Sequence, residues 1–115
     1  MKTYKGARTT HGCLVTVDGA PLDPRHDLRR YSEGDFEWGY DGAGPRQLAL
    51  ALLAEHFGDA VRALDLHRVF VETVIAELKT DDWTLTEDAI QQAIDQVAIV
   101  PMDLATLLNR VRGIR

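Results

Sequence analysis

The sequence predicts one α+β domain over residues 1–115, in which a small antiparallel sheet of two to three short strands packs against three to four helices. Three observations support this class. Turn formers separate β-branched and aromatic residues over the first forty positions, apolar residues recur at helical spacing from Pro45 onward, and 115 residues that are 45% hydrophobic match one globular domain. We therefore expect strands and turns in residues 1–44, helices in residues 45–97, and an extra C-terminal helix in residues 98–115.

The predicted sheet rests on three short segments. Residues 4–8 and 13–17 have the composition of strands, and an Asp-Gly pair at residues 18–19 closes the second segment as a hairpin signal. This order favours antiparallel pairing. A third strand is predicted at residues 36–38, where apolar and polar residues alternate and the two aromatic residues would face the core.

The first two helices have clear start and stop signals. Pro45 suits the first helical position, where its missing N–H costs little. Both faces of this helix are apolar, so we expect it to be central and mostly buried. Gly58 is a stop signal, and Asp59 is a cap for the second helix. That second helix has an apolar stripe made of Leu64, His67, Phe70, Val71, Val74 and Leu78.

A third helix is predicted near residues 87–97, after a turn at Asp81 and Asp82. Residues 84–87 offer two overlapping N-caps, and one of these is a capping box of Thr84 with Glu87. This helix would bury Ala89, Ile90, Ala93, Ile94 and Val97.

Pro101 interrupts the helical pattern, and a short last helix is expected beyond it. Its apolar stripe consists of Leu104, Leu107, Leu108 and Val111. If the first three helices already close the core, this stripe remains available to a second copy of the chain or to another protein. A homodimer through the last helix is therefore one expectation.

The chain is acidic, with 13 Lys and Arg against 18 Asp and Glu and a formal charge of -5. This balance disfavours direct binding of nucleic acid, which requires a basic surface. Residues 81–103 contain no Lys or Arg. A solvated helix face explains most such runs. The alternative is an acidic patch that binds a protein with a basic surface, and its contact residues would be Asp81, Asp82, Asp88 and Asp95.

The cysteine content and the lengths of the apolar runs indicate in which cellular compartment the protein is found. Cys13 is the only cysteine, which excludes an intrachain disulfide and favours a reducing environment. Residues 1–6 lack the apolar run of a secretory signal, and the longest apolar stretch, residues 48–54, is too short to cross a bilayer. We therefore expect a cytoplasmic protein that does not bind a membrane.

A glycine-rich loop precedes the first helix. Such a loop presents backbone N–H groups and the positive end of a helix dipole to an anion, so Gly42, Gly44 and Arg46 are candidates for an anion or nucleotide site. Against this, Pro45 removes one donor, and nearby carboxylates such as Asp41 repel anions. The other interpretation is that the glycines only allow a sharp turn and close packing.

Catalytic chemistry has little support in the sequence. No two of the four histidines have the spacing of a helical metal site. Ser32 is the only serine, and no nucleophile-elbow motif surrounds it. Cys13 lies among apolar residues of a predicted strand, where a thiol is usually inert. No catalytic residue, metal ligand or cofactor is predicted, and we do not expect an enzyme.

Several motifs follow one another in a distinctive order: Tyr4-x-Gly6-x-Arg8, then Val15-Thr16-Val17-Asp18-Gly19 with Leu22, then Phe36-x-Trp38-Gly39-Tyr40-x-Gly42-x-Gly44-Pro45-x-Gln47-Leu48-Ala49, and finally Trp83-x-Leu85-Thr86. This order resembles a family of short bacterial and phage proteins that is catalogued only as a domain of unknown function. The resemblance covers about residues 4–97. It implies a bacterial, plasmid or phage origin, and it brings no known activity, cofactor or catalytic residue.

The sequence therefore favours a small non-enzymatic binding module. We expect it to act as a regulator or inhibitor through protein–protein contact, for example on a nucleic-acid-handling or host-defence complex. The partner would have a basic surface that complements the acidic residues. The alternative is an anion- or nucleotide-binding domain that uses the glycine loop.

Overall fold

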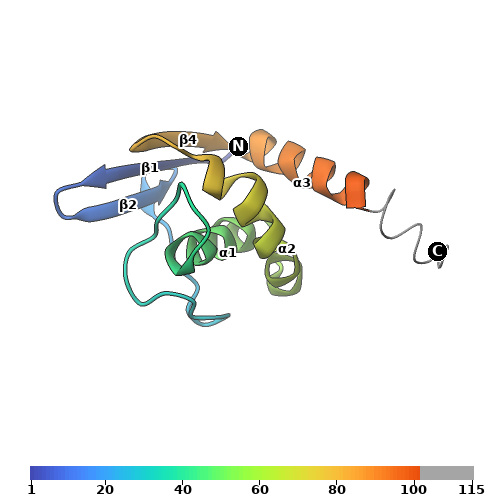
Figure 1. Ribbon diagram of the computed structural model, residues 1–115, viewed down its shortest axis with the longest axis horizontal. Helices are drawn as coiled ribbons and strands as arrows, with labels where there is room; N and C mark the ends of the chain where they lie inside the picture. Colours follow the sequence, from blue (N-terminus) through green and yellow to red (C-terminus); the bar gives the residue numbers. More distant parts are fainter. Residues whose placement is uncertain (102–115) are drawn as a thin grey trace.

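The computed structural model describes residues 1–101, with side chains described as far as Gln96. The described part contains four strands, three α-helices and one short 3-10 helix (Figure 1). In chain order these are β1 (Thr3–Thr9), β2 (Gly12–Val17), β3 (Ala20–Pro21), α1 (Ala43–Phe57), α2 (Ala60–Thr73), η1 (Ile75–Glu77), β4 (Asp82–Thr86) and α3 (Glu87–Pro101).

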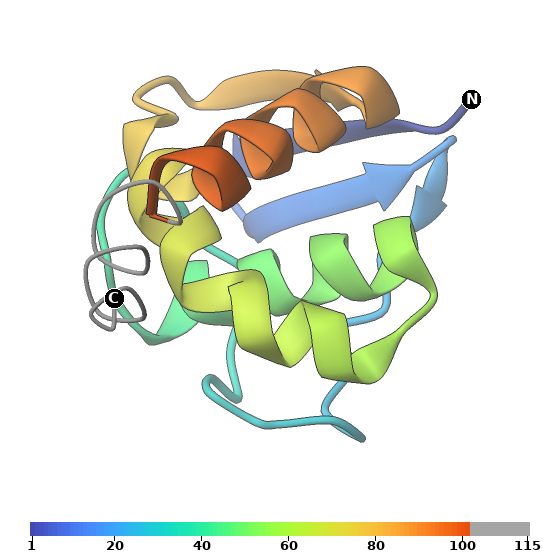
Figure 2. The ribbon, with the colours of Figure 1, turned by 90° about the vertical axis from the view of Figure 1, so that its right-hand side faces the viewer.

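The strands form one antiparallel sheet in the order β3-β2-β1-β4, and the helices gather on one side of it (Figure 2). The α+β class is confirmed. The predicted hairpin signal at Asp18 and Gly19 joins β2 to β3, because both residues have positive φ values, 51° and 87°, as a two-residue hairpin loop requires.

The predicted strand at residues 36–38 does not form. Instead, these residues belong to the irregular connection between β3 and α1, although both aromatic side chains are buried as expected. Trp38 packs edge-on against Trp83 with ring centroids 5.5 Å apart, and its indole N–H donates to the carbonyl of Thr80. Packing in the core therefore fixes this segment without strand pairing.

The fourth strand, β4, occupies the residues in which the sequence indicated a turn and helix caps. It pairs with β1 so that Trp83 lies opposite Gly6. A side chain at Gly6 would overlap the Trp83 indole, so the absence of a Cβ there is what lets the ring cover the strand. This pairing joins residues far apart in the chain, and local patterns do not reveal it.

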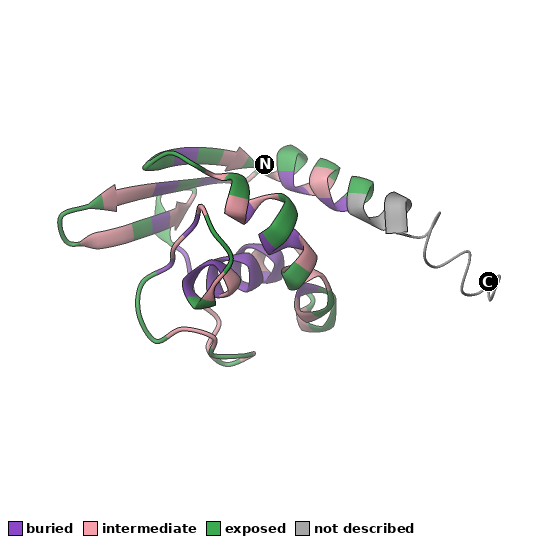
Figure 3. Cartoon of the chain, in the orientation of Figure 1, coloured by how far each residue is buried: buried purple, intermediate pink, exposed green. Residues whose placement is uncertain are grey.

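Helix α1 is the centre of the core, as expected. Ten of its fifteen residues are buried, on all sides of the helix (Figure 3). It ends at Gly58, which has a φ of 66°, and Asp59 caps α2 by accepting from the amides of Val61 and Arg62. Pro45 is the third residue of α1 and not the first. Helix α2 ends at Thr73, where η1 takes over part of the predicted second helix.

Helix α3 starts at the expected place, and its cap lies within residues 84–87, where two overlapping N-caps were expected. The hydroxyl of Thr86 accepts from the amide of Ala89, whereas the carboxylate of Glu87 accepts from the amide of Lys2, so the predicted box with Thr84 does not form. Ile90 and Ile94 are buried and Ala93 is half-buried, but Ala89 is exposed.

The end of α3 differs from the prediction, because the helix reaches Pro101, beyond the expected residue 97. The side chain of Val97 lies outside the part described. The apolar stripe predicted for a last helix, which consists of Leu104, Leu107, Leu108 and Val111, also lies outside the described residues.

Candidate functional site

The four acidic candidates lie at the two ends of β4. Asp81 precedes this strand and Asp82 begins it, whereas Asp88 and Asp95 lie on α3 beyond its other end. A five-residue strand spans about 13–17 Å. On α3, Asp88 and Asp95 are two helical turns apart, about 10 Å along the axis. The structure therefore spreads these carboxylates along one margin of the molecule and does not collect them on one helix.

The four carboxylates differ in their partners. Asp81 accepts from Arg8 at 3.1 Å, and Asp95 accepts from the side-chain amide of Gln91 at 2.9 Å. Asp82, Asp88 and Asp95 are exposed, and no cation within the described part of the chain forms an ion pair with any of them. Their negative charge is open to solvent.

The glycine loop is packed against its surroundings. Gly44 is buried, and a Cβ there would lie 2.9 Å from the Cβ of Glu37. Arg46, the basic residue of the predicted anion site, donates from Nε to the carboxylate of Asp41 at 3.2 Å. Gly42, the N-cap, is extended and offers no side-chain cap. The loop thus brings the three candidates together, with Arg46 already paired.

A polar network connects β1 to the segment before α1. The guanidinium of Arg8 donates to Glu37 at 2.9 Å, to Asp81 at 3.1 Å and to the carbonyl of Trp38 at 2.8 Å, and it lies 4.7 Å from the centre of the Trp38 ring. The hydrogen bond to Glu37 raises the pKa of Arg8 further above its ordinary value. Arg8 therefore ties the sheet to the aromatic core.

Cys13 belongs to the same network and is not set up as a nucleophile. Its thiol donates to Glu37 at 3.2 Å. Burial, followed by this hydrogen bond and the charge of Glu37, raises the pKa of the Cys13 thiol to about 11. Burial also raises the pKa of Glu37, but the hydrogen bonds from Arg8, Cys13 and Trp38 prevail, so the pKa of this carboxyl lies below its ordinary value. At neutral pH, Cys13 is therefore a protonated thiol.

The most heavily bonded side chain in the helical region is one that the sequence analysis did not single out as a site. Gln47 is 1% exposed, and its side chain makes four hydrogen bonds to the connection between β3 and α1. Its oxygen accepts from the amides of Tyr31 and Ser32, and its nitrogen donates to the carbonyls of Pro24 and Arg29. A lone glutamine within an apolar helix was the signal in the sequence.

His56 and His67 serve as packing and hydrogen-bonding groups. His67 stacks on Tyr31, and its Nδ1 is 2.7 Å from the carbonyl of Leu64. Nε2 of His56 is 2.7 Å from the side-chain oxygen of Gln91, which links α1 to α3. In residues 1–101, no three His, Cys, Asp or Glu side chains gather in a way that could hold a metal ion.

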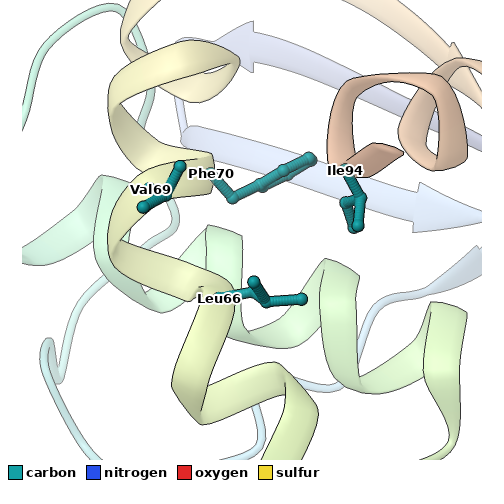
Figure 4. Close-up of a pocket in the computed structure, with 4 residues that line it drawn as sticks. All are labelled: Leu66, Val69, Phe70 and Ile94. Carbon is teal, nitrogen blue, oxygen red and sulfur yellow. The ribbon is translucent and has the colours of Figure 1, made fainter. Parts of the chain in front are cut away.

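Two of the hollows in the structure differ in size and in position. A gap of about 10 Å³ lies between α2 and α3, lined by Leu66, Val69, Phe70 and Ile94 (Figure 4). This space is about the size of one water molecule, so it is a small packing gap where α3 contacts α2. A larger, shallow hollow of about 300 Å³ lies on the helix-free face of the sheet, where Leu14 is 52% exposed beside Lys5 and Asp82.

The fold and these surfaces define a small α+β domain that carries exposed carboxylates along one margin. The chain belongs to DUF6166, a family of unknown function whose model matches residues 4–96, and this confirms the expected membership of a family catalogued only as a domain of unknown function. No curated protein and no solved structure matches the chain. Among the residues that the structure describes, no helix combines the length and the apolar character needed to cross a membrane.

Proposed function

We propose that this protein is a non-enzymatic binding module of the cytoplasm, of bacterial or mobile-element origin. It binds a protein with a basic surface and regulates or inhibits that protein by contact. A component of a nucleic-acid-handling or host-defence complex is a suitable partner, because its basic surface normally faces phosphate and would also attract carboxylates.

The observation that carries this proposal is the set of open carboxylates around β4 and α3. Asp82, Asp88 and Asp95 are exposed, and residues 80–101 contain no Lys or Arg that could neutralise them locally. Asp81 is the exception, since Arg8 already offsets its charge. An unneutralised surface of one sign speeds association with the opposite sign and selects against partners of like charge.

The experiment begins with capture of partners from host extract at low salt and continues with titration of one purified partner. Replacing Asp82, Asp88 and Asp95 by asparagine should weaken binding and flatten its dependence on salt. The matched control neutralises Asp65, Glu72 and Glu77, which are exposed on α2 and η1. If both triple variants lose affinity equally, net charge explains the binding and the proposed surface is wrong.

The alternative function, an anion or nucleotide site at the start of α1, has one supporting observation. The first turn of α1 contains no acidic residue, and no side chain caps its N-terminus. An anion there would have to draw Arg46 away from Asp41. Thermal stabilisation by phosphate or nucleotides that disappears in Arg46→Ala would support this site, and the absence of stabilisation in the unmodified chain would exclude it.

A further inference from the structure

Strand β4 leaves one edge of the sheet open. It is the last strand in the order β3-β2-β1-β4, and no other strand of the described residues pairs with its outer side. In both ribbon views its outer edge faces away from the helices (Figures 1 and 2). Asp82, Thr84 and Thr86 are exposed along it, whereas Trp83 is buried and Leu85 half-buried. An open edge of this kind is a template for another strand.

The register shows which backbone groups point outward. The amide of Arg8 donates to the carbonyl of Asp81, and the amide of Glu87 donates to the carbonyl of Lys2, at the two ends of the β1–β4 ladder. In an antiparallel ladder, hydrogen-bonded and non-bonded pairs alternate. Trp83 therefore bonds to β1, as does Leu85.

It follows that the backbone groups of Asp82, Thr84 and Thr86 point away from β1. One of these groups is already used, because the hydroxyl of Thr80 donates to the carbonyl of Asp82 at 2.6 Å. The carbonyl of Thr86, the residue before α3, is the natural acceptor of the first hydrogen bond of that helix. The amides of all three residues and the carbonyl of Thr84 remain for an incoming strand.

The charges at the ends of this edge indicate the chemistry of the occupant. Asp81 and Asp82 lie at the start of β4, where Arg8 offsets the charge of Asp81 and leaves that of Asp82 open, and Glu87 and Asp88 lie immediately after its end. Lys79 is the nearest cation before the strand along the chain, and its ammonium group donates to the carbonyl of Gly39. A strand added to this edge would thus run between two acidic ends, and cationic side chains would be favoured at both.

A second copy of the chain is a poor occupant. If two β4 strands paired antiparallel about Thr84, residue 82 of one copy would face residue 86 of the other. At both ends of the new ladder Asp81, whose charge Arg8 offsets, would face Glu87, and Asp82, which has no ion pair in the described residues, would lie next to that Glu87. Like charges brought close together across a sheet are destabilising. The outer edge of β4 therefore disfavours pairing with β4 of a second copy and favours pairing with a basic strand.

We infer that β4 binds an extended basic segment of a partner protein as a fifth strand, with Thr84 at the centre of the new pairing. This inference rests on the proposed function and specifies how the partner is held. Main-chain hydrogen bonds would supply affinity, and the acidic ends would select lysine and arginine. This binding mode predicts that the outward-pointing amides, which belong to alternate residues of β4, bond to the partner strand.

The test uses the full chain and an eight-residue peptide of alternating lysine and valine, with blocked ends. Thr84→Pro removes an outward-pointing N–H and leaves the ladder with β1 intact, and proline is tolerated at such edge positions. Thr84→Val is the matched control, since it keeps the N–H and the branched shape. We expect Thr84→Pro to weaken binding about tenfold or more and Thr84→Val to change it little. Thermal melting of each variant establishes that it is folded.

Amide hydrogen exchange provides the second readout. Peptide should slow exchange at Asp82 and Thr84, whose amides point outward, and leave Trp83 and Leu85 nearly unchanged, because those amides already bond to β1. This alternation, together with loss of binding in Thr84→Pro, would support strand addition.

Three results would overturn it. Equal binding to the proline and valine variants without alternating protection would leave the acidic surface as the site and exclude a fifth strand. No binding of the peptide at low salt would exclude strand addition, and the partner titration would still decide the proposed function. Protection that rises with protein concentration in the absence of peptide would show that a second copy occupies the edge.

Discussion

Removing the amide group of Gln47 should destabilise the fold strongly. It is buried in α1 and holds the connection between β3 and α1 through two accepted and two donated hydrogen bonds, between 2.6 and 3.1 Å long. All four partners are backbone groups, which cannot rotate away to find others. Gln47→Leu keeps the size of the side chain and removes every one of these bonds.

The magnitude follows from the number of bonds. A buried hydrogen bond contributes about 1 kcal/mol net, and a backbone group left without a partner costs about 1–3 kcal/mol where water cannot reach it. Arg29 is exposed, so its carbonyl can recover a bond to water, and the leucine gains some apolar burial. We therefore expect a loss of about 3–4 kcal/mol, out of a total of about 5–15 kcal/mol for a domain of this kind.

Thermal unfolding followed by far-UV circular dichroism measures this loss. For 115 residues, about 1 kcal/mol corresponds to about 4 °C, so the melting temperature should fall by about 12–16 °C. The control is Gln92→Leu on the exposed face of α3, which should change stability by less than about 0.5 kcal/mol. A fall below about 4 °C for Gln47→Leu, with unchanged hydrogen exchange at the amides of Tyr31 and Ser32, would refute the reasoning.

Three further predictions follow from other contacts. Gly6→Ala should destabilise the fold by about 1–3 kcal/mol in urea unfolding, because its methyl group overlaps the Trp83 ring, whereas a Cβ at Gly34 would lie 4.0 Å from the hydroxyl of Ser32, so Gly34→Ala should be neutral. Alkylation of Cys13 by iodoacetamide should be slow at pH 7, and its rate should rise towards pH 11. Folding raises the pKa of the Cys13 thiol from 9.0 to about 11, so the contribution of Cys13 to the free energy of unfolding should be constant below pH 9 and should fall between pH 9 and pH 11. Asp59→Ala should cost about 1 kcal/mol in the same urea assay, because it removes the cap of α2, and an unchanged unfolding midpoint would contradict this.

The helices could largely be predicted because their signals are local. The uniformly apolar sequence around residues 48–54 indicated that α1 is buried on all sides, and Gly58 and Asp59 marked the break between α1 and α2 correctly. The Asp-Gly pair at residues 18–19 likewise identified a two-residue hairpin. Each of these features depends on residues within a few positions of one another.

The sheet was only half predictable, since β4 and β1 are about eighty residues apart. Residues 82–86 alternate polar and apolar side chains, which is compatible with both a strand and a helix entrance, and the choice depends on Gly6 making room for Trp83. Conversely, the alternation at residues 36–38 suggested a strand, but the core holds Trp38 through Trp83 and Thr80. Periodicity shows which side chains are inward and does not show which backbone lies beside them.

The features of the candidate site are likewise of two kinds: those that the sequence shows and those that only the tertiary structure shows. From the sequence alone came the acidic run without Lys or Arg, the single cysteine, and the class of the fold, because composition and short-range order determine them. Only the tertiary structure placed Asp82 on an open sheet edge, paired Asp81 with Arg8 and Arg46 with Asp41, and gave Gln47 its four partners. These contacts depend on which residues, distant in the sequence, come together when the core packs. Burial of apolar surface drives that packing, and it has no directional preference that a local sequence pattern could reveal.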